Sequence, residues 1–220
     1  LNTSKGNPSI IKAHNLDYDY LFTNHLSEAE LKESGLVFLD GDEAYHSDYV
    51  HLGIDSYVTA ENYYPTMNTG LSQIAEALSC DVRIAAHPRS DYQSKPYKYS
   101  LPILKDQTFE LIKQASVVVS HGSTALQWAV IMHKPIILVT TDEMNNSIFK
   151  QTTEAFAFAL GKDVINLNRI PTKYDWKNQL FVDETKYKNY IETYTKQSGT
   201  PEKPVWDIVI DRMETDLFHA

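Results

Sequence analysis

Residues 116–142 constrain the fold of this chain more than any other stretch. A β-branched run at Val117–Val119 is followed by a small polar turn at Ser120–Thr124, an apolar helical segment at Ala125–Met132 and a second apolar run at Ile136–Val139. Two buried strands joined by one helix are typical of the βαβ unit of a parallel sheet. The stretch therefore predicts an α/β protein.

The polar turn of this unit is a candidate phosphate site. The pattern places Gly122, Ser123 and Thr124 in the first turn of the helix, where backbone N–H groups lack partners and the helix dipole is positive. The two hydroxyls add donors, and the glycine lets a ligand approach the backbone. His121, in the same turn, either contacts a ligand or packs against the turn. The alternative is that Ser123 or Thr124 merely caps the helix.

Apolar runs and one-sided apolar periodicity predict the remaining elements. Further strands are expected at 36–39, 82–86 and 164–167, with a short edge strand within 90–104. Further helices are expected at 61–79, 107–114 capped by Asp106, 148–160 ended by Gly161, 184–196 and 205–218. Alternating strands and helices predict a doubly wound, mostly parallel Rossmann-like sheet.

The chain divides into three segments by pattern. Residues 1–34 are expected to be a linker or the remnant of a preceding domain, with Ile10–Ala13 ending a strand and a short helix at 27–31. Residues 35–168 are expected to form the Rossmann-like domain, and 169–220 a helical extension that packs on it. Because the first residue is Leu1, the numbering is expected to begin inside a longer protein.

Composition and charge narrow the kinds of molecule that the protein can bind and the compartment that it suits. A net charge of −9 argues against a nucleic-acid surface, because such a surface needs a basic patch. The sequence contains no secretory signal and no apolar run near the roughly 20 residues of a membrane helix. The single cysteine, Cys80, excludes an internal disulfide and suits a reducing cytoplasm.

Polar side chains follow the predicted strands at the points where the strands end. These residues are Asp40 and Asp42, His87 and Arg89, and Asp142 and Glu143. Ligands of doubly wound sheets bind beyond the carboxyl ends of the strands, where the Gly-Ser-Thr turn also falls. The convergence favours an anion or nucleotide site over a lone helix cap.

The residue types suggest roles at such a site. His87 and Arg89 would place two cations beside a phosphate, and His87 can donate a proton to a leaving phosphate oxygen near neutral pH. The alternative is that His87 only bonds the strand end. Asp142 or Glu143 could accept hydrogen bonds from a ribose, as acidic residues do in nucleotide-binding α/β folds.

The acidic turn after the first strand allows three interpretations. Asp40 and Asp42 suit Mg²⁺ or Mn²⁺, or cap the next segment as a solvated turn, or one of them acts as general base for an acceptor hydroxyl. We name Asp42 as the candidate base. His46, Asp48 and His51 match no closed zinc site, so no metal is expected there.

Three motifs resemble a known family. They are Ile-Ala-Ala-His-Pro-Arg at 84–89, Val-Ser-His-Gly-Ser-Thr-Ala at 119–125 and Lys-Pro-Ile-Ile at 134–137. Together they resemble the C-terminal, donor-binding half of bacterial GT-B glycosyltransferases that build capsular or other surface polysaccharides. In the sialyltransferases and Kdo transferases among these, a His-Pro pair and a Ser/Thr turn hold the cytidine monophosphate of the donor. The resemblance covers about residues 36–167.

The resemblance implies a function and its partners. His87 would bind or protonate the leaving phosphate, and Ser123 and Thr124 would bind its oxygens. Transfer would need no metal and no cofactor beyond a nucleotide-sugar donor, with a CMP-sugar favoured over uridine or guanosine donors. The acceptor would be a glycan or a lipid-linked sugar, and the protein would be cytoplasmic, with peripheral association at the inner face of the membrane.

One departure from the family leaves alternatives open. The general base of these enzymes lies largely on an N-terminal domain, which this chain lacks or carries only within 1–34. Glycerophosphate transferases of teichoic-acid synthesis and non-hydrolysing sugar epimerases remain competing interpretations. So do a metal-dependent transferase and a non-catalytic nucleotide- or sugar-binding domain.

Overall fold

The structure, a computed structural model, describes residues 10–23 and 35–218. The chain divides into two compact units, one of residues 27–188 and one that joins residues 1–26 to 189–220. The short helix expected at 27–31 lies outside the described residues. Along the part of the chain that is described, no helix combines the length and the apolar character needed to cross a membrane.

Six parallel strands form one sheet in the unit of residues 27–188. They are β1 (Leu36–Leu39), β2 (Val82–Ala85), β3 (Ile103–Leu104), β4 (Val117–Ser120), β5 (Ile136–Thr140) and β6 (Val164–Asn166). Their order across the sheet is β3-β2-β1-β4-β5-β6, the order of a doubly wound Rossmann-like sheet. The predicted fold class is confirmed.

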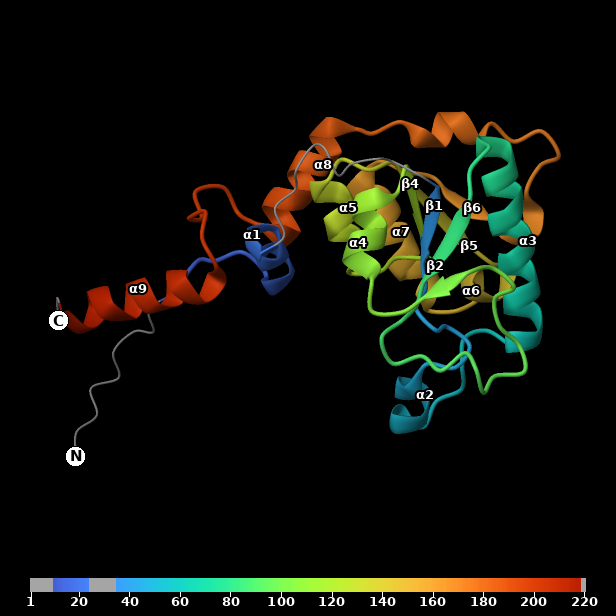
Figure 1. The fold of residues 1–220 in the computed structure, drawn as a ribbon, viewed down its shortest axis with the longest axis horizontal. Helices are drawn as coiled ribbons and strands as arrows, with labels where there is room; N and C mark the ends of the chain where they lie inside the picture. Colours follow the sequence, from blue (N-terminus) through green and yellow to red (C-terminus); the bar gives the residue numbers. More distant parts are fainter. Residues whose placement is uncertain (1–9, 24–34, 219–220) are drawn as a thin grey trace. The chain divides into compact units, whose positions relative to one another are not determined.

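Helices cover both faces of this sheet. The long helix α3 (Ala60–Leu78) lies on one side, and α4 (Thr108–Gln114) and α5 (Leu126–Ile131) lie on the other (Figure 1). Alternate strand residues such as Phe38 and Val119 pack in the core that includes α3. Because both faces are covered, β1 and β4 are buried along their whole length, as their continuous apolar sequences predict.

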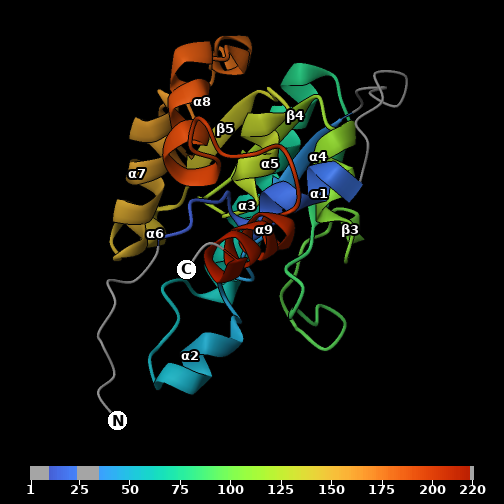
Figure 2. The ribbon, with the colours of Figure 1, turned by 90° about the vertical axis from the view of Figure 1, so that its left-hand side faces the viewer.

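The other helical segments of this unit, apart from the helix that begins at Glu184, come after β1, β5 or β6 in the chain. They are α2 (Ser47–Leu52), α6 (Asp142–Asn145), α7 (Phe149–Leu160) and the 3₁₀ turns η3 (Leu167–Arg169) and η4 (Trp176–Leu180). In Figure 1 α2 lies beyond the carboxyl end of β1, and Figure 2 shows the edge strand β3. Gly161 ends α7 with a φ of 65°, as expected.

The expectation for Asp106 was wrong. Gln107, not Asp106, is the N-cap residue of α4, and no side chain caps that helix end. Asp106 instead has a φ of 60°, a left-handed conformation that an N-cap residue does not use. Local sequence located the helix correctly because its apolar face is long, whereas the cap depends on a single backbone angle.

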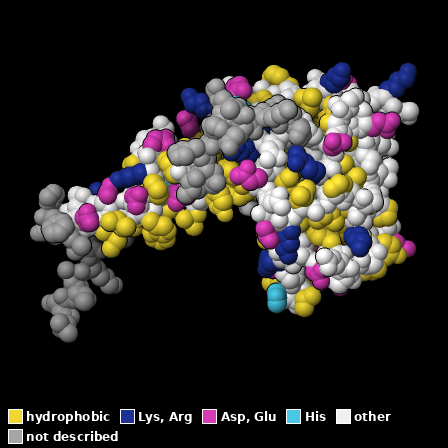
Figure 3. Space-filling model, in the orientation of Figure 1, with side chains coloured by type: hydrophobic (Ala, Val, Ile, Leu, Met, Phe, Trp, Pro, Cys, Tyr) yellow, Lys and Arg dark blue, Asp and Glu magenta, His cyan; other side chains and the backbone are white. Residues whose placement is uncertain are grey.

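The second unit joins the two ends of the chain. Within it η1 (Leu16–Asp19) is followed directly by α1 (Tyr20–Thr23). The residue before η1 donates from Asn15 N to Thr195 O at 2.9 Å, and the start of α9 (Val205–Phe218) donates from Val205 N to Asp19 Oδ1 at 3.0 Å. Residues 10–13 form no strand, contrary to expectation. Trp206, Ile210 and Met213 of α9 are exposed. Figure 3 shows hydrophobic side chains along this helix.

The helix expected at 184–196 changes its character partway. It is α-helical as α8 (Glu184–Tyr190) and then continues as a π-helical segment, η5 (Ile191–Thr195). The helix at 205–218 matches the predicted limits. Periodicity alone cannot distinguish an α-helix from a π-helical continuation, because both keep similar side chains on one face.

Candidate nucleotide site at the carboxyl edge of the sheet

The strand order defines where a ligand would lie. The chain runs outward from β1 through β2 to β3 and then returns to β4 on the other side of β1. The point between β1 and β4 is therefore the topological switch point, at which ligands of such sheets bind. Leu39 pairs with Ser120 in register, so the loops that begin at Asp40 and His121 leave the sheet at the same level.

The turn after β4 precedes the helix rather than forming part of it. Because α5 begins at Leu126, Gly122, Ser123 and Thr124 do not lie in its first turn, which corrects the sequence-based expectation. Ser120 Oγ accepts a hydrogen bond from Gly122 N at 3.1 Å, and Ser123 Oγ accepts one from Ala125 N at 3.2 Å. Both hydroxyls therefore hold the turn in shape.

Two backbone donors of this turn are left open. Within the described residues, the amides of Ser123 and Thr124 donate to no acceptor. Thr124 is exposed and Ser123 partly exposed. Successive free N–H groups in a turn form a concave site for anions. The turn can therefore bind phosphate oxygens without relying on a helix dipole.

Gly122 is required by the packing of the turn. Its φ is 129°, which an L side chain rarely adopts, and a Cβ at this position would lie 2.9 Å from Cδ2 of Phe156 in α7. The backbone of the turn thus lies directly against α7. This contact fixes where the free amides lie relative to the sheet.

His121 points into the core instead of toward a ligand. Its Nδ1 donates to Val139 O at 2.7 Å, its Nε2 accepts from Tyr63 OH at 2.9 Å, and the residue is 2% exposed. Burial lowers the pKa of His121 to about 4, so the ring is neutral at pH 7. Of the two roles considered for His121, the structure shows packing, because neither ring nitrogen is available to a phosphate.

His87 and Arg89 lie together after β2, as predicted. His87 is half-buried and its Nδ1 accepts from Arg89 N at 3.3 Å, which places the proton of the neutral ring on Nε2. Burial, followed by the charges of His46 and Arg89, lowers the pKa of His87. The ring is therefore a neutral Nε2–H donor at pH 7.

Two further residues complete this group, which we name the basic cluster: His46, Asp48, His87 and Arg89. Arg89 forms an ion pair with Asp48 at 3.0 Å, and the rings of His46 and His87 lie 4.8 Å apart between centroids. The sequence indicated only loop residues at 46 and 48. Their partner Arg89 lies more than forty positions later, beyond the reach of local pattern.

The acidic turn after β1 is buried. Asp42 has a φ of 55° and is 5% exposed, and burial raises its pKa against the opposing charges of Lys95 and His46. A general base must come within hydrogen-bond reach of the proton that it abstracts. The burial of Asp42 therefore argues against that role for it.

Metal binding was a separate possibility for the acidic turn. Among the described residues no three His, Cys, Asp or Glu side chains are placed to hold a metal ion.

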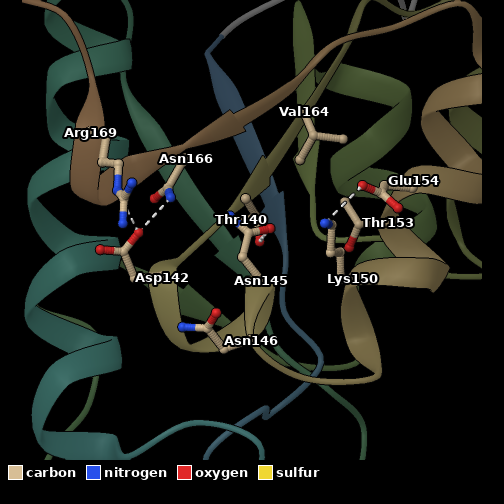
Figure 4. A pocket seen from close by; sticks show the side chains of 10 residues that line it. All are labelled: Thr140, Asp142, Asn145, Asn146, Lys150, Thr153, Glu154, Val164, Asn166 and Arg169. Carbon is tan, nitrogen blue, oxygen red and sulfur yellow. Dashed lines mark hydrogen bonds and ion pairs between the residues drawn. The ribbon is translucent and has the colours of Figure 1, made fainter.

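Asp142 and Glu143 are separated by their partners. Asp142 lines a polar pocket of about 410 Å³ beyond β5 and β6, where its Oδ1 accepts from Asn166 Nδ2 at 2.7 Å and from Arg169 Nε at 2.9 Å (Figure 4). Within the described residues its Oδ2 accepts nothing. Both oxygens of Glu143 are instead occupied by Thr59 and Asn62. Of the two, Asp142 has an oxygen free for a ribose.

The predicted residues thus share one edge of the sheet but fall into four groups. These are the acidic turn after β1, the basic cluster after β2, the turn after β4 and the loop after β5, where Asp142 lines the pocket. In the described part of the chain, no hydrogen bond or ion pair joins the basic cluster to Ser123 or Thr124. A ligand that contacts both groups would have to bridge them across β1.

Comparison with known proteins gives structural similarity only. No family model and no curated protein matches the sequence. The UDP-GlcNAc 2-epimerase of Methanocaldococcus jannaschii, solved in complex with UDP-GlcNAc and UDP, is similar with a TM-score of 0.41 and 13% identity over 80% of this chain and 52% of that one. The spinosyn rhamnosyltransferase SpnG is similar with a TM-score of 0.38 and 12% identity over 96% of this chain and 53% of that one. The chain spans about half the length of each structure.

Similarity at this level carries no argument about the fold or the activity of this chain. The assignment to the doubly wound α/β class rests on the strand order and the parallel ladders described above.

Proposed function

We propose that this chain is the nucleotide-sugar-binding half of a GT-B glycosyltransferase that builds bacterial surface polysaccharide. One observation carries the proposal: the switch point of the sheet presents two free backbone amides, at Ser123 and Thr124, beside an exposed hydroxyl. Phosphate groups bind to such donors at the carboxyl edge of Rossmann-like sheets.

His87 would act on the leaving group. The bond between the anomeric carbon and the phosphate oxygen breaks while an acceptor hydroxyl forms the new glycosidic bond. The Nε2–H of His87 donates to the departing phosphate oxygen, Arg89 adds positive charge, and the turn binds the other oxygens. The proton of the acceptor passes to a base that the preceding domain supplies, because Asp42 is buried. No step needs a metal ion.

The pocket beyond β5 and β6 would hold the nucleoside. Asp142 Oδ2 would accept a hydrogen bond from a ribose hydroxyl, while Asn166 and Arg169 keep the carboxylate in place. Glu143 takes no part in this proposal. As the sequence resemblance implies, we propose cytidine as the nucleoside of the donor and a glycan or lipid-linked sugar as the acceptor. We place the reaction at the cytoplasmic face of the membrane.

A second function has one observation in its favour. The candidate base Asp42 is buried, so the chain alone has no assigned group to activate an acceptor. This favours a non-catalytic nucleotide- or sugar-binding module. Sugar transfer by the longer gene product, assayed with and without a chelator, distinguishes the two functions and also tests the metal-dependent alternative.

Thermal unfolding with CMP, CDP, UDP and GDP tests the binding site. A nucleotide that binds only the folded state raises Tm according to RT ln(1 + [L]/Kd). We expect one nucleotide to stabilise the chain without Mg²⁺ and Ser123→Ala to abolish the shift. Ser147→Ala is the matched control, because Ser147 Oγ accepts from Phe149 N at 3.1 Å in a similar turn before α7. Equal nucleotide shifts in both variants would overturn the proposal.

A further inference from the structure

A row of hydrogen-bonding groups crosses the core from β1 to β5. Asp40 Oδ1 lies 2.6 Å from Tyr99 OH, which lies 3.3 Å from Tyr63 OH. Tyr63 OH lies 2.9 Å from His121 Nε2, and His121 Nδ1 lies 2.7 Å from Val139 O. All four side chains are buried, with 1–6% of each residue exposed. The row links residues from four separate segments of the chain.

Counting hydrogens shows that an ionised Asp40 leaves this row incomplete. His121 Nδ1 must donate to Val139 O, so Nε2 accepts the single hydroxyl hydrogen of Tyr63. An ionised Asp40 takes the single hydroxyl hydrogen of Tyr99. The contact of 3.3 Å between the two phenol oxygens then contains no hydrogen.

One added proton completes the row. If Asp40 Oδ1 carries it, Asp40 donates to Tyr99, Tyr99 donates to Tyr63, and Tyr63 donates to His121, so every contact holds one hydrogen. The proton can also sit on His121 Nε2 with all donors reversed. That arrangement leaves an imidazolium and a carboxylate buried some distance apart, which is costly. The neutral arrangement, with the proton on Asp40, is therefore preferred.

The groups around Asp40 also disfavour its charge. Asp42 and Glu43 on its own loop are acidic, and the phenols that α3 contributes, Tyr63 and Tyr64, carry no positive charge that would offset a carboxylate. Among the described residues no lysine or arginine forms an ion pair with Asp40. Its Oδ2 is buried without a hydrogen bond of normal geometry, and an orphan oxygen costs less when the carboxyl is neutral.

The titration behaviour of the two ends agrees with this geometry. Burial raises the pKa of Asp40 to about 7, although the hydrogen bond from Tyr99 and the backbone amide of Asp42 oppose it. At the other end, burial lowers the pKa of His121 to about 4. Near pH 6 the proton therefore belongs to Asp40.

We propose that Asp40 is a protonated carboxylic acid in the folded protein near pH 6 and that its proton completes, through Tyr99 and Tyr63, the row of hydrogen bonds that ends at His121. Loss of the proton to solvent leaves Asp40 as a carboxylate, turns the Tyr99 hydroxyl toward it and removes the hydrogen from the contact with Tyr63. This assignment does not depend on whether the chain binds a nucleotide sugar.

Infrared difference spectroscopy across pH 5 to 9 tests the assignment directly. Because burial also raises the pKa of Glu43 to about 8, the Asp40 band is followed in the Glu43→Gln background. There we expect the carbonyl stretching band of a protonated carboxyl at pH 6, its loss as the pH passes about 7, and its absence once Asp40→Asn is added. Glu43→Gln removes the neighbouring buried carboxyl and should keep the Asp40 band. A wild-type protein without the band, or an Asp40→Asn variant that keeps all of it in the Glu43→Gln background, would overturn the proposal.

Tyr63→Phe tests the row rather than the carboxyl alone. The Tyr63 oxygen accepts from the Tyr99 hydroxyl only when Asp40 is protonated, so the substitution destabilises the protonated state and not the ionised one. We therefore expect the midpoint of the Asp40 band to fall by about half to one pH unit. Tyr64→Phe is the matched control, because the Tyr64 hydroxyl is buried without a hydrogen-bond partner. If Tyr63→Phe leaves the midpoint where Tyr64→Phe does, no row connects Asp40 to His121. Both variants keep the ring in the core, so they also remain informative if Asp40→Asn fails to fold.

Discussion

The carboxylate of Glu143 caps the start of α3 through Thr59. Its Oε2 accepts from Thr59 N at 2.9 Å and its Oε1 accepts from Thr59 Oγ1 at 2.9 Å, across 84 positions of sequence. Thr59 is the N-cap residue of α3 but its own side chain makes no capping bond. Glu143 therefore accepts, from the loop after β5, the backbone N–H of the N-cap residue, which is the bond that an N3 carboxylate makes in a capping box.

This contact predicts unequal effects for the adjacent acids. Glu143→Ala should lower the free energy of unfolding by about 0.5–1.5 kcal/mol, because it removes the acceptor of the hydrogen bonds from Thr59 and Asn62. Asp142→Ala should cost less, because its ion pair with Arg169 is exposed. Urea denaturation of both variants measures the difference. Equal losses would show that the cap contributes little.

Gly122 should tolerate no side chain. Gly122→Ala combines an unfavourable φ, which costs about 1–3 kcal/mol, with a clash against Phe156. Gly53→Ala is the control, since Gly53 has a φ of 64° but nothing within 4 Å of the added Cβ. We expect Gly122→Ala to be the less stable of the two in urea and to lose nucleotide binding. If it binds nucleotide as Gly53→Ala does, the turn is not the phosphate site.

Stability should fall as the pH rises from about 6.5 to 8. Burial raises the pKa of Asp40 from 3.8 to about 7 and that of Glu43 from 4.5 to about 8. In this window the folded state holds protons that the unfolded state has lost, so deprotonation favours unfolding. Below about pH 6.5 the lowered pKa of His121 makes stability rise with pH, because there the unfolded imidazole holds a proton that the folded one does not.

Glu43→Gln measures one part of this slope. We expect the variant to lose less stability than the wild type between pH 6.5 and 8 in urea denaturation. Glu76→Gln, at an exposed position on α3, should leave the slope unchanged. A Glu43→Gln variant with the wild-type slope would show that the side chain is charged at neutral pH in the folded protein.

Phosphate binding should raise the pKa of His87. Its lowered pKa reflects burial and the nearby charges of His46 and Arg89, and a phosphate close to Nε2 would favour the imidazolium. Proton NMR titration of the histidine rings with and without the stabilising nucleotide measures the shift. The exposed His51 serves as an internal control. A shift shared equally by His51 would indicate screening by the ligand rather than contact.

The sheet could be predicted because its signal is local. Continuous apolar runs such as Leu36–Leu39 and Val117–Ser120, separated by helical periodicity, specify buried parallel strands and their helices. The positions of Ser123, Thr124 and His87 at strand ends follow from the same pattern. Their chemical roles remain predictions.

The partners of the site residues could not be predicted in the same way. Glu143 meets Thr59, and His121 meets Tyr63, only because the folded sheet brings the loops after β4 and β5 over the start of α3. A histidine beside a Gly-Ser-Thr turn has the same sequence whether its ring faces solvent or the core. The ring of His121 faces the core because Val139 O accepts from its Nδ1 and Tyr63 OH donates to its Nε2, and both partners lie far from His121 in the sequence.

The most direct measurement is an amide NMR titration of the chain with whichever nucleotide raises its Tm. We predict that the largest shifts fall on the backbone N–H groups of Ser123 and Thr124, and that Ser123→Ala weakens the affinity while Ser147→Ala does not. Shifts confined to the pocket at Asp142, with the turn amides unmoved, would contradict the assignment of the turn as the phosphate site. So would saturating nucleotide without any shift at the carboxyl edge of the sheet.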